Sequence, residues 1–151
     1  MANQRETVRM SEAEIGQLFA YARKVQIATI NLDGTPHLVT MFFGLADGKI
    51  AFWTYRSSRK ALNLARDPRL TCLVEDGEDY FELRGVQVGG EVRVIDDLAG
   101  VTEVGKLIAA RMPDVPKEAL DAYVEHAARK RVAYVVEPRN VASWDHRKLL
   151  S

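Results

Sequence analysis

The stretch WTYRSSRKALNLARDP, residues 53–68, decides how this chain is interpreted. It predicts the end of a β-strand at Thr54, a short turn, and a helix over residues 58–66 that Ser57 or Ser58 caps. The dipeptide Asp67-Pro68 then predicts the end of the helix, because proline cannot continue it. A single short helix therefore directly follows a strand, with its first turn beside the strand end.

Two cations, Arg59 and Lys60, fall in the first turn of this helix. The helix macrodipole is positive there, and the first backbone N–H groups have no partner inside the helix. The two cations are therefore repelled by the positive end of the helix. A phosphate or carboxylate bound between the cations and the helix would offset this repulsion. Alternatively, the two residues are ordinary exposed side chains, which costs only about 0.3 kcal/mol each in that position. The local sequence leaves both interpretations open.

Upstream of this stretch, the sequence predicts a helix and a three-stranded antiparallel meander. A capping-box pattern over residues 11–14 begins the helix, and two turns containing Asp-Gly separate apolar runs of strand character. The expected elements are a helix over residues 12–22 and strands over 25–30, 36–45 and 50–54.

Downstream, the pattern predicts three further strands and two amphipathic helices. The expected strands cover residues 70–75, 80–94 and 131–137, the expected helices cover 97–111 and 116–129, and an irregular tail covers 140–151. Six strands in mostly sequential order favour an antiparallel barrel with flanking helices, mainly β within the α+β class. The length of 151 residues fits one domain, residues 1–151.

The composition bears on the partners and the compartment. Lys plus Arg equals Asp plus Glu at 21 each, whereas general nucleic-acid binders carry a basic excess. No apolar run approaches the roughly 20 residues that span a bilayer, and residues 1–10 are too polar for a signal-peptide core. We therefore expect a cytoplasmic protein that binds neither nucleic acid nor membranes.

Metal and covalent catalytic sites are not predicted. His37, His126 and His146 are isolated in the sequence, so no metal site is expected. Cys72 lies in an apolar strand-like run and is expected to be a small buried hydrophobe. Neither a G-x-S-x-G elbow nor a G-x-G-x-x-G loop is present. If the protein is an enzyme, a cofactor must carry the reaction.

The run Ser-Arg-Lys-x-x-Asn-Leu-x-x-Asp-Pro at residues 58–68 resembles the pyridoxamine 5′-phosphate oxidase-like split β-barrel superfamily. The segments YFELRG (80–85) and SWDHRKL (143–149) are similar to the deazaflavin-dependent reductase branch, which uses coenzyme F420. The resemblance covers nearly the whole chain. It implies a six-stranded antiparallel split β-barrel of the FMN-binding type, present as a homodimer with a flavin-type cofactor at each end of the interface.

The resemblance also implies which residues hold the cofactor. The phosphate contacts would be Thr54, Ser58, Arg59 and Lys60, with Arg56 as an extra contact. The ring contacts would come from the second strand, at Val39, Thr40, Met41 and Phe42. Arg66 and Arg69 would join the other cations in pairing with an anionic tail. Trp144 would either cover the site from the partner subunit or act as a hydrophobic clasp on its own barrel.

One departure from the superfamily affects the predicted reaction. The vitamin oxidases carry an Arg and a Leu-Lys pair on the second strand, whereas residues 38–43 here are uncharged, and the Arg-Leu-His-Asp-Arg-type tail is absent. We therefore expect an oxidoreductase that transfers a hydride from reduced F420 to a conjugated, electron-poor small molecule. The alternatives are an FMN-dependent oxidoreductase and a non-catalytic flavin- or deazaflavin-binding protein. Catalytic residues are unknown, with His37 and Tyr55 the only candidate proton donors.

Overall fold

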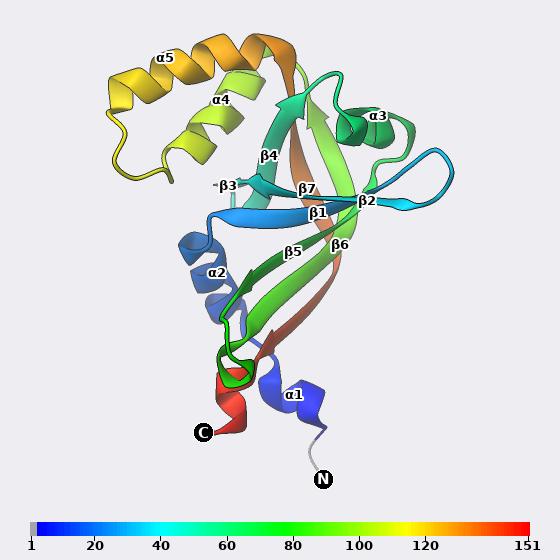
Figure 1. Cartoon of the computed structure of the whole chain (residues 1–151), viewed down its shortest axis with the longest axis vertical. Coiled ribbons are helices and arrows are strands. Elements are labelled where there is room, and N and C mark those ends of the chain that lie inside the picture. Colours follow the sequence, from blue (N-terminus) through cyan, green and yellow to red (C-terminus); the bar gives the residue numbers. More distant parts are fainter. Residues whose placement is uncertain (1–2) are drawn as a thin grey trace.

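The computed structural model describes residues 3–151 as one antiparallel sheet that curls on itself, with helices at its ends (Figure 1). The strand order is β2-β1-β5-β6-β7-β4-β3. The strands are β1 (Lys24–Ile30), β2 (Pro36–Phe42), β3 (Gly44–Ala46), β4 (Lys49–Tyr55), β5 (Arg69–Asp76), β6 (Arg84–Ile95) and β7 (Arg131–Asp145). The helices are α1 (Gln4–Val8), α2 (Glu12–Tyr21), α3 (Arg59–Arg66), α4 (Leu98–Ala109) and α5 (Lys117–Ala127).

The curled sheet confirms the antiparallel half-barrel architecture with flanking helices, but the described residues form seven strands where six were expected. The predicted run 36–45 is divided, because Phe43 is buried and Gly44 packs so closely on α4 that a Cβ there would lie 2.9 Å from the backbone of Leu107. The short strand β3 therefore turns away from β2 and pairs with β4.

The predicted meander is correct in its first hairpin, whereas in its second only the end of the predicted strand 36–45 pairs with the next strand. Strands β1 and β2 pair from Lys24↔Phe42 to Ile30↔Pro36. In contrast, β4 pairs with β3 and with β7 rather than with β2, so it lies at the opposite end of the strand order. Because β7 is more than 70 residues away in the chain, this pairing follows from tertiary packing rather than from local sequence.

The C-terminal half differs from the prediction at two places. Residues Tyr80–Glu82 form a 3-10 turn, so β6 begins at Arg84 rather than at residue 80. The final strand does not end before Pro138 but continues to Asp145, so the tail is not irregular until that point. A register shift at Gly89/Gly90 places Gly90 opposite Pro138, where the missing proline N–H is tolerated.

The core has two parts, one inside the curl of the sheet and one beneath α4. The inner part includes Leu18 of α2, Ile27, Phe52 and Cys72, all fully buried. Burial raises the pKa of the Cys72 thiol to about 12, which confirms its expected role as a buried hydrophobe.

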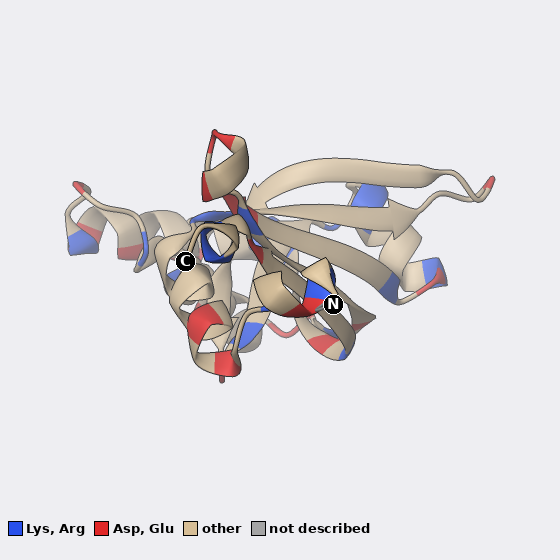
Figure 2. Ribbon diagram, turned by 90° about the horizontal axis from the view of Figure 1, so that it is seen from below, with Lys and Arg blue, Asp and Glu red and all other residues tan. Residues whose placement is uncertain are grey.

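Lys, Arg, Asp and Glu lie mainly in the helices and turns, whereas the strands are mostly uncharged (Figure 2). Within residues 3–151, no helix is long and apolar enough to cross a bilayer.

Candidate functional site

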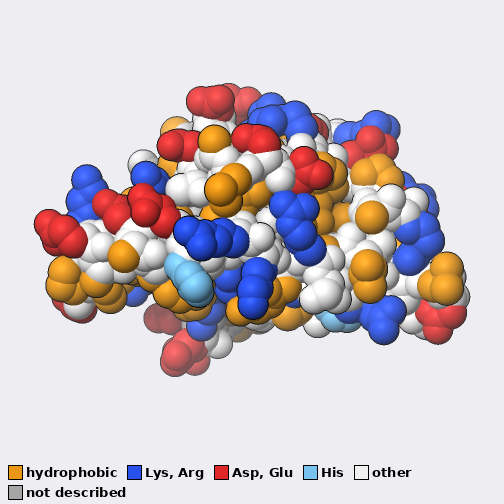
Figure 3. Space-filling model, turned by 90° about the horizontal axis from the view of Figure 1, so that it is seen from above, with side chains coloured by type: hydrophobic (Ala, Val, Ile, Leu, Met, Phe, Trp, Pro, Cys, Tyr) orange, Lys and Arg blue, Asp and Glu red, His pale blue; other side chains and the backbone are white. Residues whose placement is uncertain are grey.

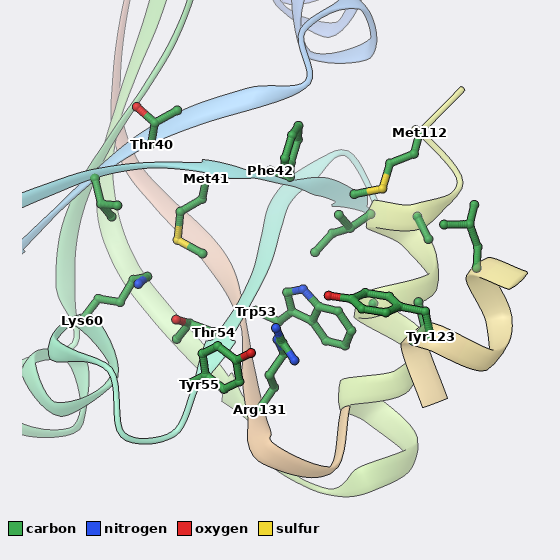
Figure 4. A pocket seen from close by; sticks show the side chains of 16 residues that line it. Thr40, Met41, Phe42, Trp53, Thr54, Tyr55, Lys60, Met112, Tyr123 and Arg131 are labelled. Atoms are coloured by element: carbon green, nitrogen blue, oxygen red, sulfur yellow. The ribbon is translucent and has the colours of Figure 1, made fainter. Parts of the chain in front are cut away.

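A pocket of about 470 Å³ opens between the edge strand β2, the end of β4 and the helices α4 and α5. One end of the pocket is polar and lies at the start of α3, where Lys60 and Thr54 line it. The other end is apolar and lies against α4 and α5 (Figure 4). The volume is in the range of small-molecule and cofactor sites, about 300–1,000 Å³.

The polar end is built by the turn between β4 and α3. Ser58 has extended backbone and accepts a hydrogen bond from the Ala61 N–H at 3.2 Å, so it caps α3 as predicted. The buried Thr54 hydroxyl donates to Ser58 Oγ at 3.1 Å, which fixes the end of the strand to the cap. The first turn of α3 contains no acidic residue, so nothing in it offsets the positive end of the helix.

Lys60 projects from this first turn into the pocket, with its ammonium directed toward Met41 and Thr54 (Figure 4). The side chain is half-buried, and burial lowers the pKa of its ammonium below the usual 10.5. Among residues 3–151, no carboxylate lies within 4.0 Å of Lys60. A half-buried cation at a helix start without a carboxylate fits a bound phosphate or carboxylate ligand.

The lowered pKa of Lys60 predicts that anion affinity falls at alkaline pH. A bound anion favours the ammonium form and raises the Lys60 pKa, so binding takes up protons between the two pKa values. Affinity for the anionic cofactor expected from the sequence should be level near neutral pH and fall at more alkaline pH. Fluorescence titrations of wild type and Lys60→Gln across this range would test the prediction. An equal fall in both proteins would contradict it.

The other predicted cations take different positions. Arg59 is exposed on the outer side of the first turn and does not line the pocket. Arg56 is exposed and donates from Nη2 to the carbonyl oxygen of Asp96 at 2.9 Å. Arg66 donates to the Ile30 carbonyl, and Arg69 pairs with Asp67 at 2.7 Å. Arg69 therefore has a carboxylate partner within its own chain, and its contact with an anionic tail stays a prediction.

A buried amide holds α3 on the sheet. Asn63 is 1% exposed, and its Nδ2 donates to Thr29 Oγ1 at 3.1 Å and to Asn31 Oδ1 at 3.0 Å. Arg66 donates to Asn63 Oδ1 at 3.2 Å, so both ends of the amide are used. Satisfied buried polar groups of this kind specify one arrangement of the elements that they join. Asn63 thus fixes the direction in which the start of α3 faces the pocket.

The second strand contributes alternating side chains. Val39 and Met41 are half-buried, whereas Thr40 and Phe42 are more exposed. Met41 points into the pocket, and Thr40 and Phe42 point to the opposite face of β2 (Figure 4). All four residues border the pocket, but the strand period of two allows only alternate side chains to enter it. His37 is not among the pocket residues, and its Nδ1 is buried with no partner among the described residues.

The pocket also contains residues that were not predicted as site residues from the sequence, among them Trp53, Tyr123 and Arg131. The guanidinium of Arg131 lies 4.9 Å from the ring centroid of Trp53 and 4.1 Å from that of Tyr55. Tyr55↔Arg131 is a register pair between β4 and β7, which no local pattern reveals.

The same pairing brings two basic segments together. The Arg56 N–H donates to the Lys130 carbonyl oxygen at 3.1 Å, so the turn at residues 56–58 lies beside residues 130–131. Figure 3 shows Lys and Arg side chains gathering near the middle of the face that carries this end of the molecule. The polar end of the pocket therefore opens toward a basic surface despite the net charge of zero.

Trp144 lies elsewhere in the same chain. It is a register partner of Gly85 near the end of β7, and a Cβ at Gly85 would overlap its indole ring. Trp144 does not line the pocket of its own chain, so its contact with a partner's cofactor stays a prediction. Within residues 3–151, no group of three His, Cys, Asp or Glu side chains is placed to hold a metal ion.

Three solved structures illustrate the similarity of this fold to known proteins. A conserved hypothetical protein from Mycobacterium tuberculosis is 37% identical with a TM-score of 0.91, over 99% of this chain and 94% of that chain. An F420 reductase is 23% identical with a TM-score of 0.62, over 83% and 94%. A heme storage protein from Vibrio cholerae is 15% identical with a TM-score of 0.65, over 87% and 94%. The last two show the shared fold alone.

No curated protein matches this chain in sequence. The family model described as pyridoxamine 5′-phosphate oxidase, however, matches residues 11–145, which include every strand and the start of α3. The chain therefore belongs to the pyridoxamine 5′-phosphate oxidase family and its split-barrel superfamily.

Proposed function

We propose that this protein is an oxidoreductase that uses reduced coenzyme F420 to reduce a conjugated, electron-poor small molecule. The observation that carries the proposal is the half-buried Lys60, without a carboxylate partner among the described residues, at the capped start of α3. In our proposal the F420 phosphate binds there, against Ser58, Thr54 and Lys60, while Arg59 and Arg56 attract the anionic tail from the surface. The F420 reductase that shares this fold supports the choice of cofactor class.

The residues of the pocket would bind and orient rather than react. Val39 and Met41 offer an apolar wall beside the ring system, and the indole of Trp53 closes the opposite side. The bound deazaflavin would supply the hydride. The protein would hold the two reactants in one geometry and exclude water, which is worth several kcal/mol of barrier. Tyr55, which lines the pocket, is a better-placed proton donor than His37, which does not.

The choice of F420 over FMN rests on charge. Side chains on β2 between Leu38 and Phe42 carry no charge that could hold a flavin ring, whereas the basic surface outside the pocket suits a tail of phosphate and glutamates. FMN has a single phosphate and would leave most of these cations without a partner. We therefore expect tighter binding of F420 than of FMN.

We also propose a homodimer that associates through the face of the sheet opposite the pocket. On that face, a row of uncharged side chains crosses five strands at Thr40, Gln26, Leu73, Gln87 and Ala142. Leu38 and Phe42 beside it are 69% and 52% exposed. Gln26 Oε1 is buried without a partner among the described residues. In such a dimer, Trp144 would be available to the site of the partner subunit.

Fluorescence titration and turnover assays test the proposed function directly. The purified protein is titrated with F420 and with FMN, and reduced F420 is then supplied with a panel of quinones, enones and tetrapyrroles. We expect F420 to bind more tightly than FMN and its oxidation to depend on one class of acceptor. Tighter FMN binding would overturn the cofactor assignment. F420 binding without any turnover would favour a non-catalytic binding protein.

A further inference from the structure

Arg131 is held in one orientation on the wall of the pocket. Its guanidinium stacks on Tyr55 at 4.1 Å and on Trp53 at 4.9 Å, measured to the ring centroids. Nη1 also donates to the Ala127 carbonyl oxygen at 3.1 Å. Stacking and a backbone hydrogen bond together restrict a side chain that is otherwise flexible, so fewer rotamers are lost when it binds a ligand. Arg131 is therefore preorganised toward the pocket.

The charge of Arg131 has no counterion in the described chain. No carboxylate of residues 3–151 lies within 4.0 Å of its guanidinium, and the Ala127 carbonyl is its only protein acceptor among the described residues. Several N–H donors of its planar fork thus remain for a ligand. A guanidinium fork matches a carboxylate in geometry, with two parallel hydrogen bonds.

The space next to Arg131 is apolar. Trp53 and Tyr123 face it, and the Tyr123 hydroxyl is directed toward the indole (Figure 4). We call this part of the pocket the helical compartment. Its other residues are Gly105, Ile108, Ala109, Met112, Leu120 and Val124. Gly105 is required at this wall, because a Cβ there would lie within 2.5 to 2.8 Å of Trp53 and Val124. The helical compartment therefore offers flat apolar surfaces with a single cation at its edge.

We propose that the helical compartment binds the substrate as a planar apolar molecule with a carboxylate, and that Arg131 holds this carboxylate. Lys60, at the other end of the pocket, is left to the cofactor phosphate. The statement that this ligand is the substrate rests on the proposed function. The preference of the helical compartment for a planar carboxylate does not. Arg131 is thus a specificity-determining residue for the class of substrate.

A matched pair of probes tests the proposal without any cofactor. The full-length protein is titrated by calorimetry with 2-naphthoate and with 2-naphthamide, which share size and planarity but differ in charge. We expect the acid to bind about tenfold more tightly than the amide, as for a charge-assisted hydrogen-bonded pair. Equal affinities would overturn the proposal. Because no F420 is present, this result is independent of whether the proposed function is correct.

Variants then test whether Arg131 is the residue that binds the carboxylate. Arg131→Gln should abolish the preference for the acid, and Arg131→Lys should retain part of it. Arg129→Gln, which removes an exposed cation two residues away and outside the pocket, should leave it unchanged. Leu120→Trp should weaken both probes, because it fills the helical compartment. An equal loss of acid and amide binding in Arg131→Gln would reveal packing alone and contradict the proposal, as would a preference that is lost only in Lys60→Gln.

Discussion

Replacing Arg59 and Lys60 together with glutamine should lower the affinity for F420 about 100-fold while the barrel stays folded. Lys60 lines the pocket and Arg59 lies on the same helix turn, so the variant removes both charges beside the unpaired N–H groups of α3. Charge-assisted hydrogen bonds to a phosphate are worth about 1.5–3 kcal/mol each, and partial exposure reduces their sum. Fluorescence titration of both proteins measures the effect.

A matched control separates the loss of these two cations at the site from a general loss of positive charge. Lys106→Gln/Lys117→Gln also removes two cations, but from exposed positions on α4 and α5. Its affinity for F420 should remain within about twofold of wild type, because neither side chain lines the pocket and salt screens exposed charges. Both double variants should melt at the wild-type temperature. Unchanged affinity in the Arg59/Lys60 variant, or an equal loss in the control, would contradict the anion site.

Asn63→Ala should destabilise the fold by about 2–4 kcal/mol and weaken F420 binding as well. The substitution removes three hydrogen bonds, the buried one to Thr29 and the part-buried ones to Asn31 and from Arg66, and leaves the oxygen of Asn31 without this donor. It also leaves a small cavity where α3 rests on β1. Chemical denaturation gives the loss in free energy of unfolding, and titration under folding conditions gives the loss in affinity.

The neighbouring Leu62 provides the control for Asn63. Leu62 is 51% exposed on the same helix, so Leu62→Ala should change the free energy of unfolding by less than about 0.5 kcal/mol. A stability loss in Asn63→Ala with unchanged F420 affinity would contradict the positioning role of Asn63. The amide would then serve stability alone.

Features encoded within a few residues were predicted well from the sequence. The capping box at Ser11 and Glu14 is present with both of its hydrogen bonds, and Ser58 caps a helix that ends at Arg66. These signals are read locally, since a cap satisfies N–H groups within the next turn. The polar end of the pocket follows from the same short stretch, since Thr54 and Lys60 line it and Ser58, which does not, is hydrogen-bonded to Thr54.

Features that depend on pairing between distant segments were not predicted. Arg131 reaches the pocket only because β7 pairs with β4, and its sequence neighbourhood shows only the start of a strand. The end of β7 was misjudged at Pro138, because the bulge opposite Gly90 that accommodates it belongs to another strand.

A crystal structure of the protein with F420 tests the central claim most directly. We expect the phosphate oxygens within about 3.2 Å of the Ser58 hydroxyl and the Lys60 ammonium, at the first turn of α3. The deazaflavin ring should lie along Val39 and Met41, on the pocket side of β2. A phosphate bound at Arg131 instead, with the start of α3 facing only solvent, would contradict the account.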